Sequence, residues 1–323
     1  MLIAVLILSI VAMTLGRYSM SVKEVLAVLL PKWFAEVEVI DTMRTVIFDI
    51  RLPRVLLALI SGAGLSVAGA AFQGLFSNPL ATPDTLGVST GASFGAALGI
   101  LMGASAMQIQ LLALCTGMAA VLLVYLVGRM NGTSSMIMIV LSGMVISALF
   151  SAMVSLIKYV ADPQDVLPTI TFWLMGSMSG TTKQTLEMGA PLILIGTVLI
   201  FTLRFKLNAL SLPEDEAKSL GINIKLIRLL IILGATMITA SVVSMCGQIG
   251  WVGLLIPHIS RMLFGNNNKY VLPASILLGA IFMLVVDTLA RSASAAEIPV
   301  SILTAVIGAP FFIILLRRTG GIK

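Results

Sequence analysis

Side chains that could perform covalent or metal chemistry are few in this sequence. It contains one histidine, His258, and two cysteines, Cys115 and Cys246, which lie far apart in apolar stretches. A metal site, or a nucleophile with its base, needs several such groups close together. We therefore expect these three residues to be structural, and we expect the chain to have no catalytic residue, no metal site and no cofactor of its own.

One acidic residue, Asp287, lies inside a long apolar stretch, and Arg291 follows it four positions later. Residues four apart share one face of a helix, and a carboxylate inside a membrane normally has a partner. The spacing therefore predicts an ion pair between Asp287 and Arg291 near the end of a helix.

A polar stretch at 205–226 separates two apolar segments. Within it, Ser211 and Pro213 can begin a helix, Glu214 to Glu216 supply acids to its first turn, and Gly221 can end it. We predict a short capped helix in water, which is either an element on which a separate motor acts or an ordinary surface helix. The sequence has no G-x-x-x-x-G-K-[ST] loop for phosphates, so ATP hydrolysis would belong to another polypeptide and the chain is not expected to be an enzyme.

The elements that position these residues must lie in lipid. Hydrophobic residues make up 59% of the 323 residues and charged residues 11%, too few to cover a water-facing surface. A helix crosses the bilayer with about 20 apolar residues. We predict an all-α, polytopic membrane protein with ten transmembrane helices, at 1–15, 55–76, 86–103, 109–127, 136–157, 186–203, 227–245, 252–264, 271–290 and 302–316.

These helices are expected to form a single permease domain over 1–323, with an extracytoplasmic surface segment at 16–50 and a cytoplasmic coupling region at 205–226. Placing both termini in the cytoplasm gives the inner loops an excess of basic residues, whereas charges in the outer loops balance. The net charge of +6 is spread thinly between the helices, so no nucleic-acid partner is expected.

Several ordered motifs suggest a family. They include Arg51-Leu-Pro-Arg54, Asn78-Pro-Leu-Ala-Thr-Pro-Asp84, Trp173-Leu-Met-Gly-Ser177, Glu216-Ala-Lys-Ser-Leu-Gly221, Gly250-Trp-Val-Gly-Leu-Leu-Ile-Pro-His-Ile-Ser-Arg261 and Asp287-Thr-Leu-Ala-Arg291. In this order they resemble the signature of the FecCD family of ABC importer permeases, which take up iron siderophores, haem or cobalamin. The resemblance covers nearly the whole chain.

The resemblance implies a set of partners. They are a second copy of the chain or a close paralogue, two ATP-binding cassette subunits that hold ATP and Mg, an extracytoplasmic substrate-binding protein, and the lipid of a bacterial or archaeal cytoplasmic (inner) membrane. The pore would lie between the two permease subunits.

The resemblance also implies roles for particular residues of this sequence. Arg51, Arg54 and Arg291 would dock the binding protein, although Arg51 and Arg54 could instead anchor a helix at the headgroups. A cytoplasmic gate would consist of Asn78, Pro79 and Leu80 with Thr133, Ser134 and Ser135, although a plain turn would also explain the first three. The ATPase would couple to Ser211, Leu212, Pro213, Glu214, Asp215, Glu216, Ala217, Lys218, Ser219, Leu220 and Gly221.

The expected cargo is a metal chelate, with a ferric siderophore first, haem and cobalamin next, and oxyanions such as molybdate also open. The alternative function is an ion-coupled secondary transporter of a small solute. Such a transporter normally carries several intramembrane carboxylates, and this sequence offers one.

Overall fold

The computed structural model of the chain describes residues 1–16, 18–34, 36–128, 136–210, 216, 219, 221–294 and 297–319. Within these ranges the secondary structure is helical. The first half contains α1 (Leu2–Thr14), α2 (Val22–Leu29), α3 (Asp41–Thr45), a π-helical segment (Val46–Arg51), α4 (Leu52–Leu75), a 3-10 turn (Pro83–Leu86), α5 (Val88–Leu101), α6 (Ala106–Gly128) and α7 (Met136–Val160). The second half contains α8 (Val166–Leu174), α9 (Lys183–Thr202), α10 (Arg204–Ala209), α12 (Ile224–Cys246), α13 (Val252–Phe264), α14 (Asn268–Ser292) and α15 (Val300–Thr319).

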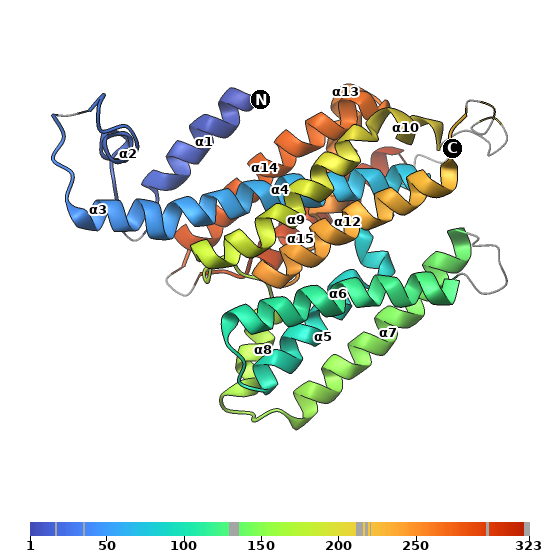
Figure 1. The fold of residues 1–323 in the computed structure, drawn as a ribbon. Coiled ribbons are helices and arrows are strands. Elements are labelled where there is room, and N and C mark those ends of the chain that lie inside the picture. Colours follow the sequence, from blue (N-terminus) through green and yellow to red (C-terminus); the bar gives the residue numbers. More distant parts are fainter. Residues whose placement is uncertain are drawn as a thin grey trace.

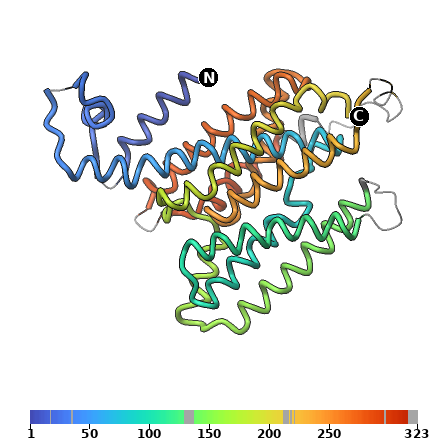
Figure 2. The backbone as a smooth tube through the Cα atoms, in the orientation of Figure 1, coloured from blue at the N-terminus to red at the C-terminus, as the bar shows by residue number. Residues whose placement is uncertain are grey.

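The helices form two groups. Figures 1 and 2 show α5 to α8 lying together below a larger group that contains α4, α9, α12 and α14. In the larger group, α4 packs along α14, α12, α9 and α13. The helix α12 also packs against α5 and α6, and so connects the two groups. The helix α4 is therefore the central element of the larger group, because it packs against the other helices of that group.

Six apolar stretches are long enough to cross a membrane: Asp41–Leu75, Ala106–Gly128, Ile137–Val160, Lys183–Thr202, Ile224–Cys246 and Asn268–Ser292. Four further apolar helices, Leu2–Thr14, Val88–Leu101, Val252–Phe264 and Val300–Ile314, are shorter. Each of the ten predicted segments thus corresponds to an apolar helix. Crossing is supported by length for six of them, and the count of ten stays a prediction.

The start of the second predicted segment differs from the structure. We expected this helix to begin at residue 55, but helical structure already begins at Asp41 and continues through Arg51 into α4, and the surface location of 16–50 stays a prediction. Charged side chains suggested a boundary at the headgroups. Arg51 and Arg54 lie within continuous helical structure and are buried against the protein, so their charges do not mark the end of the helix.

Glycine allows α4 to approach its neighbours closely. A methyl group on Gly69 would overlap the backbone carbonyl of Gly253 in α13, and one on Gly62 would overlap the carbonyl of Gly279 in α14. Small residues let helix backbones meet in lipid. Gly62 and Gly69 therefore serve close packing between helices.

Candidate functional site

A cluster of charged side chains lies where α4 begins and α14 ends. The Nε atom of Arg54 donates to both carboxylate oxygens of Asp287, at 2.9 and 3.2 Å, and Arg54 Nη1 donates to Glu297 at 3.1 Å. Arg291 Nε lies 3.7 Å from Asp287 Oδ2, which confirms the predicted pair. Asp287 is completely buried. A buried carboxylate requires partners, and here two guanidinium groups provide them.

The arginines of this cluster also hold the end of α1. Arg51 donates to the carbonyls of Met13 and Tyr18, and Arg291 donates to those of Ala12 and Leu15. The last carbonyls of a helix have no partner within it, and cations are favourable there. The two guanidinium groups therefore join α1 to α4 and α14.

The three predicted docking residues are thus turned toward the protein interior. Arg51, Arg54 and Arg291 have exposed fractions of 4%, 8% and 9%. Their partners are Asp287, Glu297 and backbone carbonyls of the same chain. Docking of a binding protein by these residues stays a prediction, and the geometry adds a second role, in which they hold three segments of the chain together.

The predicted gate turn lies at the opposite end of α4. Asn78 N donates to Gln73 O at 3.2 Å, and Asn78 Oδ1 accepts from Leu80 N at 2.9 Å, which closes a tight turn. Asn78, Pro79 and Leu80 are exposed. Further on, burial raises the pKa of Asp84, whereas a hydrogen bond from Ser89 opposes this rise.

The other half of the predicted gate, Thr133 to Ser135, lies outside the described residues. The predicted ATPase-coupling helix lies mostly outside them too, since only Glu216, Ser219 and Gly221 are described between 211 and 221. Ser219 Oγ donates to Glu216 O at 2.7 Å. Gly221 has a φ of +73°, the left-handed conformation with which helices commonly end. Both roles stay predictions.

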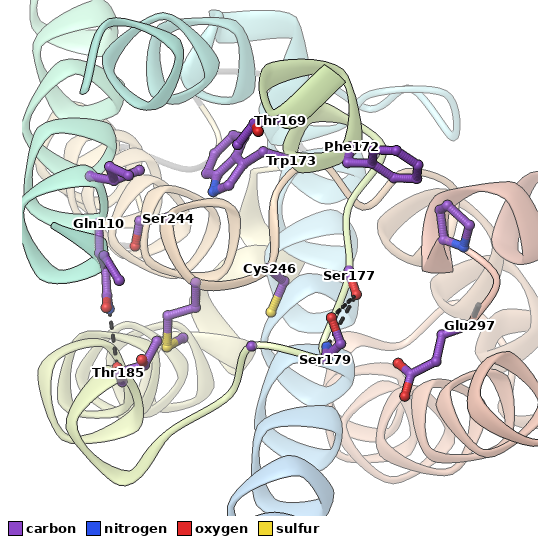
Figure 3. A pocket seen from close by; sticks show the side chains of 15 residues that line it. Gln110, Thr169, Phe172, Trp173, Ser177, Ser179, Thr185, Ser244, Cys246 and Glu297 are labelled. Atoms are coloured by element: carbon purple, nitrogen blue, oxygen red, sulfur yellow. Dashed lines mark hydrogen bonds between the residues drawn. The ribbon is translucent and has the colours of Figure 1, made fainter. Parts of the chain in front are cut away.

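A cavity of about 750 Å³ lies near the charged cluster, between α6, α8, α9 and α12. Figure 3 shows Gln110 directed toward Thr185, whose carbonyl accepts from Gln110 Nε2 at 3.0 Å. Ser177 and Ser179 are joined by a hydrogen bond of 2.9 Å in the same view. Glu297 also lines the cavity, so this space adjoins the Arg54 cluster.

A second cavity, of about 520 Å³, lies at the end of α4 that carries the predicted gate turn, Asn78 to Leu80. Its wall includes Gln73, Asn78, His258, Arg261 and Asn268. Arg261 Nη1 donates to Gln73 Oε1. Arg261 belongs to one of the motifs quoted above, but sequence reasoning assigned no role to Gln73 or Arg261, because their proximity across 188 positions has no signal in spacing.

Neither cavity has the composition of a metal site. Across the part of the chain that the structure describes, no group of three or more His, Cys, Asp or Glu residues could hold a metal ion. Cys115 and Cys246 are both free thiols.

Glu297 was also missed by sequence reasoning, since it follows the apolar helix that contains Asp287 and matches none of the motifs quoted above.

Comparison with known proteins finds one family and several relatives that match along nearly the whole chain. The FecCD transport family matches residues 2–318. The molybdate import system permease protein MolB of Haemophilus influenzae is 43% identical, over 97% of this chain and 92% of the relative. A probable iron chelatin transport system permease protein of Helicobacter pylori is 39% identical, over 99% and 98% of the two chains.

Similarity extends to solved structures and to further relatives. A metal-chelate type ABC transporter in an inward-facing conformation is similar with a TM-score of 0.88 and 41% identity, over 98% of this chain and 97% of that one. The hemin transport system permease protein HmuU of Yersinia pestis is 36% identical over 86% of this chain and 85% of the relative. With its apolar helices, its ordered motifs and a match from residue 2 to residue 318, the chain belongs to the FecCD transport family.

Proposed function

We propose that this chain is the membrane permease subunit of an ABC importer that works with a binding protein, and that its cargo is a metal chelate. The observation that carries the proposal is the similarity, along almost the whole chain, to a metal-chelate type ABC transporter of known structure. The relatives named for iron chelatin and hemin transport support the same class of cargo.

The proposal assigns energy conversion to a partner. The sequence lacks a phosphate-binding loop, so ATP and Mg bind to separate cassette subunits, two for each pair of permease chains. The segment from Ser211 to Gly221 transmits their movement to the membrane helices, and the turn from Asn78 to Leu80 forms part of the cytoplasmic gate. Both chain termini lie in the cytoplasm, and the Arg54 end of α4 faces outward.

The binding protein docks at that outer end. Exposed ion pairs contribute only about 0–1 kcal/mol each, so docking needs a surface whose parts are held in fixed positions. The contacts of Arg51 and Arg291 with the end of α1, and of Arg54 with Glu297, support such a surface. We propose that these arginines organise the docking surface, in addition to any contact that they make with the partner.

A ferric chelate is the first candidate for the cargo, and molybdate is the second. The specific observation in favour of molybdate is the 43% identity to a molybdate permease over 97% of this chain. The alternative of an ion-coupled secondary transporter has less support. Asp287, a carboxylate buried near the end of an apolar helix, is already paired with Arg54 and Arg291.

Reconstitution tests the proposal. The chain is placed in proteoliposomes with its cassette subunits and a loaded binding protein, and both ATP hydrolysis and uptake of ferric siderophore, haem, cobalamin or molybdate are measured. We expect one cargo to stimulate hydrolysis and to accumulate only when ATP is present. Uptake driven by an ion gradient without ATP would refute the proposal.

A further inference from the structure

The cavity of about 520 Å³ at the gate-turn end of α4 differs from the other cavity in its charge. Arg261 and His258 lie three positions apart on α13, and both line it. Among the described residues that line it, the remaining polar side chains are neutral hydroxyl and amide groups, and none is a carboxylate. Within the described part of the chain, Arg261 forms no ion pair. The cavity therefore presents positive charge without a compensating acid.

The position of Arg261 is fixed by the fold. Pro257 lies inside α13 and has no N–H, so the carbonyl of Gly253, four positions earlier, lacks its usual helical donor. Gln73 Nε2 lies 3.3 Å from that carbonyl and also 3.3 Å from the carbonyl of Leu254. The same amide accepts from Arg261 Nη1 through its Oε1 atom. Gln73 thus connects the interrupted helix to the guanidinium group and orients it.

The rest of the guanidinium group has no partner of its own among the described residues. Arg261 forms one hydrogen bond, to a neutral amide, although a guanidinium group carries five N–H donors. Asn268, at the start of α14, lines the same cavity with an exposed fraction of 5%, and its Oδ1 atom, which is an acceptor, is buried without a hydrogen-bond partner. The donors that the fold leaves unused here are therefore those of the Arg261 guanidinium group.

We propose that this cavity binds a tetrahedral oxyanion group, with Arg261 as its charged ligand and the neighbouring imidazole and amides as further donors. A planar guanidinium held by Gln73 suits such oxygens, because it can donate two parallel hydrogen bonds. The volume leaves room for the molecule that carries the oxyanion. That molecule is either a free oxyanion or the phosphate of a lipid headgroup. The inference does not depend on the proposed transport activity.

Two measurements on the purified full-length chain in phosphate-free detergent buffer test the proposal. Titration calorimetry uses sodium molybdate and sodium phosphate as probes, and native mass spectrometry detects anionic phospholipid that stays bound. We expect Arg261→Gln to weaken binding at least tenfold, Arg261→Lys to restore part of it, and His258→Gln to have a smaller effect. Lys206→Gln is the matched control, because it removes one exposed positive charge in α10, which packs against α14.

The outcomes separate the two sources. Binding of molybdate or phosphate that Arg261→Gln abolishes identifies a free oxyanion. Retained phospholipid that is lost in Arg261→Gln but kept in Lys206→Gln identifies a headgroup. The proposal is overturned if neither probe nor lipid binds, if Lys206→Gln is as damaging as Arg261→Gln, or if Arg261→Gln affects only association with an ATPase. If Arg261→Gln does not fold, the double variant Arg261→Lys with His258→Gln replaces it. We expect this double variant to bind more weakly, and unchanged binding would overturn the proposal.

Discussion

The two ends of α4 use arginine in opposite ways. At the start of the helix, Arg54 contacts two carboxylates, and its neighbours Arg51 and Arg291 donate to the backbone of α1. Nineteen residues later, about 28 Å along the helix, Gln73 holds Arg261 through a single neutral hydrogen bond. The first arrangement uses its charges to hold the structure together, whereas the second leaves charge available to a ligand.

This difference shows why the burial of an arginine alone does not reveal its role. Removal of one member of a buried ion pair costs stability, because the other charge then stays buried without a partner. A charge that faces a cavity and has a neutral partner leaves no such penalty. Variants at the two ends should therefore affect stability and ligand binding in different proportions.

The largest loss of stability should follow Asp287→Asn. The substitution leaves Arg54 and Arg291 buried with one carboxylate fewer, which costs about 3–5 kcal/mol of unfolding free energy. Thermal unfolding of the detergent-solubilised protein measures it. The control is Lys183→Gln, which breaks an exposed ion pair of 2.6 Å with Asp49 and should cost at most about 1 kcal/mol. Equal losses in the two variants would contradict the structural role of the cluster.

The middle of α4 should be the next most sensitive region. Gly69→Ala forces α4 away from the Gly253 carbonyl and should destabilise the protein by about 1–3 kcal/mol. Gly74→Ala in the same helix is the matched control, since its added methyl group would meet Leu207 at an ordinary 3.5 Å. Thermal unfolding compares the two, and a tolerant Gly69→Ala would show that the close approach is not needed.

At the other end, Arg261→Gln should change stability by less than about 1 kcal/mol. The substitution leaves no carboxylate unpaired among the described residues, and the Gln73 amide oxygen that loses its donor lines a cavity in which water can replace that donor. The same thermal unfolding experiment measures this. A loss as large as that of Asp287→Asn would remove the contrast between the two ends.

The smallest effect is expected in α2. Ser21 caps this helix, and hydrogen bonds from its backbone N–H and its hydroxyl lower the pKa of Glu24. Because the pKa is lower in the folded state, the ionised carboxylate stabilises the folded helix at pH values above the unfolded pKa. This stabilisation is lost as the pH falls through the folded pKa. Ser21→Ala should speed amide exchange in α2 near pH 7 and have less effect in acid. Unchanged exchange near pH 7 would rule out the cap.

Sequence reasoning predicted contacts within one helix better than contacts between helices. The Asp287 and Arg291 pair followed from a spacing of four residues, and the structure confirms it. The shorter contact of Asp287 is with Arg54, 233 positions away, and no local pattern indicates it. The helix α8 was missed because its nine residues, Val166–Leu174, are too few for a membrane crossing.

The second cavity shows the same limit. The position of Pro257 predicts from the sequence that the Gly253 carbonyl lacks its helical hydrogen-bond donor. The replacement donor, Gln73, belongs to a helix that is close to α13 only because Gly69 permits the approach. The site therefore depends on a tertiary contact, which spacing within one segment cannot predict.

The glycine contacts of α4 have a mechanical consequence. Where backbone meets backbone, as at Gly62 with Gly279 and at Gly69 with Gly253, no side-chain rotamer can change to let one helix slide past another. The helices α4, α13 and α14 therefore behave as one rigid body. The chain passes between the α5–α8 group and the larger group at two places, residues 76–87 and 175–182, so we expect a change of shape between the two groups to be absorbed in these segments.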